Sequence, residues 1–193
     1  MSRIGKWAAL IAAAVLAVAS DAPAQAWRGP DGTPSPPSES RKQVEGFGAM
    51  VLVTPDLDWQ AKWNTPPDVI PEFRESDSVA HGETVAILIF LSSPKIVDGA
   101  IDTKVDLRVI EPDGVPQADL EAEPCLTGPA KEIGANVLLC ESSMLFFASP
   151  TDPIGDYTVE VVVRDLNRGV EVPLRTRFRL TEAGSVVVAK DSK

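Results

Sequence analysis

"GDYTVEVVVRDLNRGVEVPLRTRFRL", residues 155–180, places an apolar side chain at almost every second position over two runs. A period of two is typical of β-strands that bury one face. The runs 155–165 and 169–180 are joined across the polar segment Leu-Asn-Arg-Gly, which predicts an antiparallel hairpin. The inward-facing residues are Tyr157, Val159, Val161 and Val163 on the first strand, and Val170, Val172, Leu174, Thr176, Phe178 and Leu180 on the second.

The register of this hairpin follows from residue parity. The buried set is odd-numbered on the first strand and even-numbered on the second, so the numbers of opposed residues must sum to an odd value. A four-residue loop from Leu166 to Gly169, with Gly169 in the left-handed conformation, meets this condition. The predicted pairs are Val161 with Leu174, Val163 with Val172, and Glu160 with Arg175.

The second strand carries two notable features on its outward face. Pro173 has no N–H to donate, so it predicts a sheet edge or a β-bulge. Arg175, Arg177 and Arg179 form a basic stripe in an acidic chain. The stripe could dock an acidic partner or an anionic glycan. It could instead pair across strands with Glu160 and nearby acids and protect an edge from aggregation.

Four further segments have the apolar content of strands. They are "FGAMVLVT" (47–54), "ETVAILIFLS" (83–92), "KVDLRVI" (104–110) and "NVLLCESSMLFFAS" (136–149). About seven short strands separated by turn residues predict an all-β, antiparallel two-sheet sandwich. We assign this domain to residues 46–181 and a C-terminal tail to residues 182–193.

The phrase "DPIGDYTVEVVV", residues 152–163, resembles the penultimate strand of immunoglobulin-like and fibronectin-type-III-like domains. In those folds a tyrosine at the start of this strand bonds back to the backbone as a tyrosine corner, and Tyr157 is the only tyrosine of this chain. The resemblance implies an immunoglobulin-like fold and no activity. Cys125 and Cys140 depart from the family, because they are too close in sequence for the antibody-type inter-sheet pair.

The N-terminus has the pattern of an export signal. Arg3 and Lys6 flank the start of an apolar run, residues 7–19, and Ala24-Gln25-Ala26 is a small-x-small cleavage site. We therefore expect residues 1–26 to be a signal peptide cleaved after Ala26, and the mature protein to be periplasmic or secreted. No later apolar run reaches the roughly 20 residues of a membrane helix, so no transmembrane anchor is expected. Residues 27–45, rich in Pro and Ser, predict a flexible leader.

Charge narrows the classes of partner. Removing Arg3, Lys6 and Asp21 from 18 basic and 28 acidic side chains leaves 16 and 27, a net charge near −11. Such a surface repels nucleic acid and anionic lipid, so neither is expected to bind.

The two cysteines of the chain, Cys125 and Cys140, predict a disulfide, because an even count in an oxidising compartment favours pairing. Closing a loop of about 16 residues stabilises a fold by roughly 3 kcal/mol in the chain-entropy model.

Residues that could carry catalysis are few. His81 is the only histidine, it precedes Gly82 at a strand entry, and no Gly-x-Ser-x-Gly elbow or Gly-rich phosphate loop is present. Asp98, Asp102 and Asp106 could offer oxygens to Ca²⁺, although their spacing is not that of an EF-hand. A solvated acidic loop is the competing interpretation. We expect no cofactor and no enzymatic activity.

The segment "TPDLDWQAKWN", residues 54–64, predicts a short helix over 55–63 that begins after Thr54. Trp59 and Trp63, four residues apart, would then share one face. They could stack on sugar rings or grip a partner, or they could fold down over one end of the sandwich as a plug.

These observations favour a non-catalytic exported binding or assembly module. It would act through the loop from Pro55 to His81 and through the Arg-bearing edge strand, which is suited to strand addition. Its partner would be another exported or envelope protein, or a glycan. A carbohydrate-binding module using Trp59 and Trp63 is the alternative, and a hydrolase with unidentified carboxylates is the third hypothesis.

Overall fold

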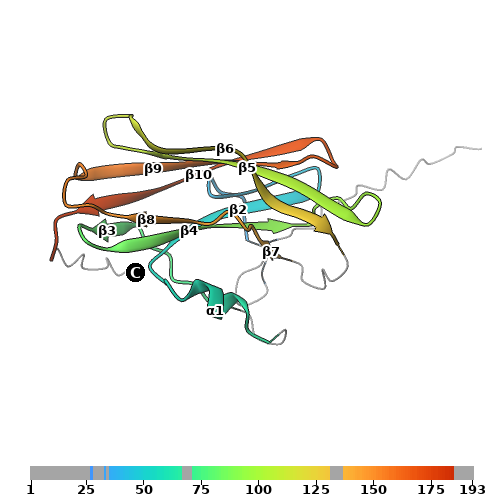
Figure 1. Cartoon of the computed structure of the whole chain (residues 1–193), viewed down its shortest axis with the longest axis horizontal. Coiled ribbons are helices and arrows are strands. Elements are labelled where there is room, and N and C mark those ends of the chain that lie inside the picture. The colour runs from blue at the N-terminus through green and yellow to red at the C-terminus, as the bar shows by residue number, and fades with distance from the viewer. Residues whose placement is uncertain (1–26, 28–32, 34, 67–70, 131–136, 185–193) are drawn as a thin grey trace, which may run out of the picture.

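The computed structural model describes residues 27, 33, 35–66, 71–130 and 137–184, and it shows two β-sheets packed face to face (Figure 1). One short helix lies outside the lower sheet of this view. The strands of the described part are β1 (Arg41–Val44), β2 (Phe47–Thr54), β3 (Ser78–Ala80), β4 (Thr84–Ser92), β5 (Ala100–Ile110), β6 (Pro116–Pro129), β7 (Leu138–Leu139), β8 (Met144–Phe147), β9 (Gly155–Asp165) and β10 (Val170–Thr181), and the helix is α1 (Trp59–Trp63).

The strands divide into two sheets of five. The first sheet has the order β1-β2-β4-β7, and β8 also pairs with β4, outside this order. The second sheet has the order β3-β10-β9-β5-β6. All pairs are antiparallel except β3 with β10, which is parallel. The predicted all-β, two-sheet sandwich is confirmed.

The hairpin of β9 and β10 has the predicted register. Val161 lies opposite Leu174, Val163 opposite Val172, and Glu160 opposite Arg175. Gly169 closes the loop with a φ of +75°, and its N–H donates to the Asp165 carbonyl at 2.8 Å. The alternation of buried and exposed residues therefore determined which residues face each other.

Pro173 lies where its missing donor costs nothing. The N–H groups of Arg175 and Arg179 point away from β9, to the carbonyls of Glu39 and Asp77, each at 2.8 Å. Because N–H directions alternate along a strand, the nitrogen of Pro173 points to the same side. At that side β3 covers only Arg179–Thr181. The predicted edge position is therefore wrong for the strand as a whole, because β10 lies between β3 and β9, and only its part before Arg179 has no partner strand on this side among the described residues.

The main core lies between the sheets and contains an aromatic cluster. The ring of Tyr157 stacks on Phe178, with centroids 5.3 Å apart, and meets Phe146 edge-on at 5.6 Å. The Tyr157 hydroxyl donates to the Pro153 carbonyl at 3.0 Å, four residues upstream, as the resemblance to immunoglobulin-like domains implies. Burial, assisted by nearby acids, raises the pKa of Tyr157 to about 12.

Tyr157 therefore gives a direct optical test of the core. Because it is the only tyrosine, the absorbance of tyrosinate at 295 nm reports one group. We expect a midpoint near pH 12 instead of the usual value of about 10. A folded-state pKa above the unfolded value means that this contribution to stability is complete below about pH 10 and is lost as the pH rises above it. A midpoint near 10 in the folded protein would place Tyr157 in water.

The domain begins earlier than the sequence predicted. Residues 41–44, assigned to the leader, form β1 and pair with Phe47–Met50 of β2. Trp27 is only 8% exposed. Backbone pairing and one aromatic side chain order parts of this segment although most of its side chains are polar. The expected signal peptide, residues 1–26, lies outside the described residues, as does the tail beyond Gly184. Within the part that is described, no helix is long and apolar enough to cross a membrane.

Candidate functional site

The outer face of the first sheet is covered by its own chain. Three side chains of β4 point outward there: Ala86, Leu88 and Phe90. They are buried beneath Trp27 and the segment between β2 and β3, which we call the α1 loop. Figure 1 shows α1 lying against this side of the molecule. The partly buried side chains that complete this second core are Met50, Leu52, Trp59, Trp63, Phe73, Val137 and Leu139.

The tryptophan pair belongs to this second core. The ring centroid of Trp63 lies 5.5 Å from that of Phe90, and Phe73 approaches the same ring at 5.7 Å. Trp59 and Trp63 therefore lie on the face of a sheet and not at one end of the sandwich. Both remain partly exposed.

The helix that carries the pair is shorter than predicted. It spans Trp59–Trp63, its N-cap is Asp58 with no side-chain capping bond, and Asn64 follows it. Thr54 does not cap it, because its hydroxyl accepts from the Asp56 N–H at 3.1 Å. The chain between Thr54 and Asp58 instead turns inward to bury Asp56.

Asp56 ties the two ends of the α1 loop together. Its side chain is 1% exposed and accepts from the Arg74 backbone N–H at 2.9 Å and from the Arg74 guanidinium at 2.7 Å. The Lys62 ammonium lies 2.8 Å from the same carboxylate. These bonds from Lys62 and Arg74 hold the pKa of Asp56 well below its usual range. We call this set of three residues the Asp56 clamp; it fixes α1 against the sheet.

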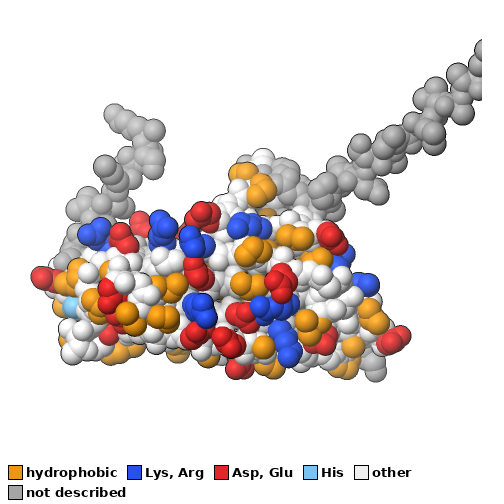
Figure 2. Space-filling model, turned by 90° about the horizontal axis from the view of Figure 1, so that it is seen from above, with side chains coloured by type: hydrophobic (Ala, Val, Ile, Leu, Met, Phe, Trp, Pro, Cys, Tyr) orange, Lys and Arg blue, Asp and Glu red, His pale blue; other side chains and the backbone are white. Residues whose placement is uncertain are grey.

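The outer face of the second sheet is charged, whereas the outer face of the first sheet is apolar. Figure 2 shows acidic and basic side chains lying side by side over the middle of this face. The ion pairs across it join Arg164 to Asp106 and Glu171, Arg108 to Asp119 and Glu121, Arg175 to Glu160, and Arg179 to Asp156.

The hollow in this face is not a free binding pocket. It measures about 150 Å³ and is lined by Asp106, Arg108, Asp119, Glu121, Glu160 and Val162. Each charged member takes part in an ion pair with another outward side chain. Small-molecule sites usually measure about 300–1,000 Å³. The hollow is therefore the gap within an ion-pair network.

The three arginines of the stripe differ in whether they form an ion pair. Arg175 pairs with Glu160, as predicted, and Arg179 lies 3.5 Å from Asp156. Arg177, opposite Thr158, is exposed and makes no ion pair within the described ranges. One cation of the stripe is thus available to a partner.

The sequence suggested two separate surfaces, the loop from Pro55 to His81 and the Arg-bearing strand β10. In the structure these two surfaces lie next to each other. After the Asp56 clamp the chain crosses to the second sheet, where Asp77 accepts from the Arg179 N–H and β3 pairs with the end of β10. The end of the loop therefore lies beside Arg177 and Arg179. We call the outward residues of β10 and the adjoining residues 77–80 the β3–β10 edge.

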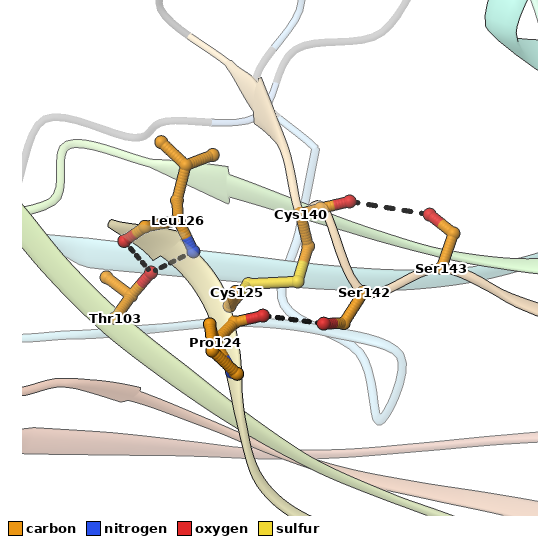
Figure 3. The surroundings of a disulfide bond; sticks show 7 residues. All are labelled: Thr103, Pro124, Cys125, Leu126, Cys140, Ser142 and Ser143. Atoms are coloured by element: carbon orange, nitrogen blue, oxygen red, sulfur yellow. Dashed lines mark hydrogen bonds between the residues drawn. A yellow bond between two sulfur atoms is a disulfide. The ribbon is translucent and has the colours of Figure 1, made fainter. Parts of the chain in front are cut away.

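The disulfide is confirmed, and it joins the two sheets (Figure 3). Cys125 lies in β6 of the second sheet, whereas Cys140 follows β7 and donates its N–H to Ile89 of the first sheet at 2.8 Å. The short spacing of the two cysteines had argued against the antibody-type inter-sheet pair. The 14 residues of β6 reach far enough for its C-terminal half to approach the other sheet, where the Glu141 N–H donates to the Cys125 carbonyl at 2.7 Å.

The remaining candidate residues do not form a site with one another. Asp98 lies in an exposed turn with a φ of +50°, and Asp102 is partly exposed on β5. In the described segments no group of three or more His, Cys, Asp or Glu side chains is arranged to hold a metal ion. The His81 ring nitrogen Nε2 lies 3.0 Å from the Asp152 carbonyl, in a contact between two turns.

No protein-family model and no curated protein matches this sequence. Among solved structures, a CARDB domain from Pyrococcus furiosus, in complex with di-metal ions, is similar at 11% identity and a TM-score of 0.39, over 76% of this chain and 99% of that domain. A Niemann-Pick type C2 protein from the Japanese carpenter ant is similar at 10% identity and a TM-score of 0.38, over 68% and 89%.

A family 123 glycoside hydrolase from Clostridium perfringens is similar at 8% identity and a TM-score of 0.39, over 69% of this chain and 27% of the hydrolase. At such low TM-scores these likenesses concern the fold and say nothing about what this chain binds.

Proposed function

We propose that this protein is a non-catalytic binding or assembly module of the periplasm or the secreted fraction, and that its partner is another exported protein. The observation that carries the proposal is Arg177, an exposed cation on the outward side of β10 that forms no ion pair with any described residue. The whole chain has a net charge of −10. A local cation in an acidic surface favours an acidic segment of the partner at that place and repels it elsewhere.

The geometry supports side-chain docking at the β3–β10 edge over addition of a full strand. Along the open side of β10, Pro173 has no N–H, and the N–H groups of Arg175 and Arg179 are already bonded. Within the described part of the chain, Glu171 and Arg177 are the two residues on this side whose N–H groups would remain free, by alternation along the strand. A partner strand would find too few donors, whereas the Arg177 guanidinium offers five.

The tryptophan pair supports protein docking over the carbohydrate alternative. A sugar platform needs open aromatic faces, whereas Trp63 packs against Phe90 and both rings belong to the second core. The hydrolase hypothesis has no comparable support, because the carboxylates of the hollow are engaged by arginines.

The proposal predicts a difference between two charge reversals on one face. Arg177→Glu is expected to weaken capture of the partner from an extract of exported proteins about tenfold or more, because it replaces an attractive contact with a repulsive one. Arg108→Glu makes the same change in net charge on β5 and should leave capture within about twofold. Capture would be quantified at two salt concentrations. Equal capture by the two variants would rule out the β3–β10 edge as the docking surface.

A further inference from the structure

Cys125 faces the core although the alternation of β6 would turn it outward. The other side chains of β6 that pack on the main core are even-numbered: Ala118, Leu120 and Leu126. Successive residues of a regular strand face opposite sides, so the odd-numbered Cys125 should face outward beside Leu126. It is nevertheless 0% exposed and belongs to the main core. A local irregularity must therefore turn this side chain inward.

The irregularity is a β-bulge at Cys125. Lys104 of β5 lies opposite Pro124, whereas the preceding residue of β5, Thr103, lies opposite Leu126. Cys125 is thus an extra residue on β6, opposite none of the described residues of β5. An extra residue of this kind bends the strand and changes the direction of its side chain. The bulge therefore accounts for the inward direction of Cys125.

The Thr103 hydroxyl holds this bulge (Figure 3). Its Oγ1 accepts from the Leu126 N–H at 2.9 Å and donates to the Leu126 carbonyl, also at 2.9 Å. Thr103 is 0% exposed, so water does not compete for these bonds. One hydroxyl thus binds both backbone polar groups of the residue that follows Cys125.

Cys140 is held in place from the other side, by the first sheet. Its N–H donates to a carbonyl of β4 at 2.8 Å. The next two residues reach across to β6: the Glu141 N–H donates to the Cys125 carbonyl at 2.7 Å, and the Ser142 hydroxyl donates to the Pro124 carbonyl at 2.5 Å. None of these bonds involves a sulfur atom. Both cysteines are therefore positioned by contacts that do not require the disulfide.

We propose that Thr103 is the positioning residue for formation of the Cys125–Cys140 bond, because its hydroxyl holds the bulge that points Cys125 at Cys140 before the two sulfurs are joined. In the reduced protein the two thiols are then already neighbours, and the disulfide closes on the folded sandwich. Without the hydroxyl, β6 relaxes toward regular alternation, which turns Cys125 away from Cys140. This inference is independent of the proposed partner.

Exchange with glutathione measures this positioning at equilibrium. One protein thiolate attacks glutathione disulfide and releases a glutathione thiolate; the second protein thiolate then attacks the protein sulfur of the mixed disulfide and releases the other. The protein gives up two electrons and two protons, and one glutathione disulfide becomes two glutathione molecules. Both cysteines are buried, so exchange passes through transient opening. The equilibrium constant does not depend on that route.

The test compares this constant for the natural protein and three variants. Thr103→Val removes the hydroxyl and should lower the constant about tenfold or more, because both bonds to Leu126 are lost. Thr103→Ser keeps both bonds and should stay within about threefold. Thr54→Val is the matched control, because it removes the hydroxyl of another fully buried threonine, which accepts from the Asp56 N–H at 3.1 Å. It should lower stability without changing the constant.

A second measurement needs no variant. In the reduced natural protein, the Leu126 amide should exchange with solvent about a hundredfold or more slowly than an amide of an unstructured chain, because its bond to Thr103 remains. Amide hydrogen exchange followed by NMR gives this rate.

Three results would overturn the proposal. Equal constants for the natural protein and Thr103→Val would show that Thr103 stabilises the oxidised and reduced forms alike and does not position the thiol. A constant for Thr103→Ser as low as that for Thr103→Val would show that the hydroxyl is not the cause. An unprotected Leu126 amide after reduction would show that the disulfide makes the bulge and not the reverse.

Discussion

Replacing Asp56 by alanine should lower the free energy of unfolding by about 2–4 kcal/mol. The substitution removes two charge-assisted bonds and leaves the Arg74 backbone N–H without its acceptor. Breaking a fully buried ion pair costs about 3–5 kcal/mol. The expected loss is smaller here because the Arg74 side chain is 74% exposed and can be rehydrated.

Urea unfolding followed by tryptophan fluorescence measures this loss. Asp58→Ala is the matched control, because Asp58 is 65% exposed and touches Lys62 only at 3.8 Å. It should change stability by less than about 0.5 kcal/mol. If Asp56→Ala were as mild as Asp58→Ala, the clamp would not hold the loop.

The Asp56 clamp also predicts a pH dependence. Lys62 and Arg74 lower the folded-state pKa of Asp56, so its contribution is complete above the unfolded pKa of about 3.9 and is lost as the pH falls below that value. The stability difference between the natural protein and Asp56→Asn should therefore shrink from about pH 4 downward. A constant difference down to pH 2 would contradict the assignment.

Removing the disulfide with Cys125→Ala and Cys140→Ala should cost about 3 kcal/mol, within the usual range of 2–5. β6 is an edge strand that pairs only with β5 among the described strands. The Cys125–Cys140 bond holds its C-terminal half against the first sheet. Loss of the bond should therefore affect exchange of β6 amides more than those of β9.

Reduction provides the control for this experiment. The natural protein in excess reductant should unfold at the same urea concentration as the double variant, and reductant should not change the variant. A double variant within 1 kcal/mol of the oxidised protein would show that the two sheets hold β6 without the bond.

The sequence predicted the structure best for strands that have one buried face and one solvent-exposed face. In β9 and β10 strict alternation determined both the strands and their register, down to the pairing of Glu160 with Arg175. The same alternation placed the arginine stripe on the outward side. The disulfide followed from cysteine count and the expected compartment.

Elements with little buried surface escaped prediction. β1 and β6 are held by backbone pairing, and most of their side chains are exposed or only partly buried, so neither carries an apolar period. β6 also contains three prolines, at positions 116, 124 and 129, which suggest loop. The role of Asp56 depends on Arg74, 18 residues away. A contact between residues so far apart leaves no local pattern in the sequence.

The sequence also did not predict that the loop from Pro55 to His81 ends beside β10. It depends on β3, a strand of three residues that pairs in parallel with Arg179–Thr181. So short a segment has no detectable period. The sequence indicated both surfaces but not that they adjoin.

The two outer faces of the sandwich differ in character. The first is filled by Trp27, Trp59 and Trp63 and is fixed by the Asp56 clamp. The second displays paired charges and Arg177, which forms no ion pair with the residues that the structure describes. We therefore propose that a partner contacts the β3–β10 edge, and we treat the tryptophan pair as part of the fold.

Site-specific photo-crosslinking tests this placement most directly. A crosslinker at position 177 and one at position 60, which is exposed on α1, would be compared in the native cell. We predict an adduct with one exported protein from position 177 and none from position 60. An adduct from position 60 alone would contradict it and would make the tryptophan-bearing loop the contact surface.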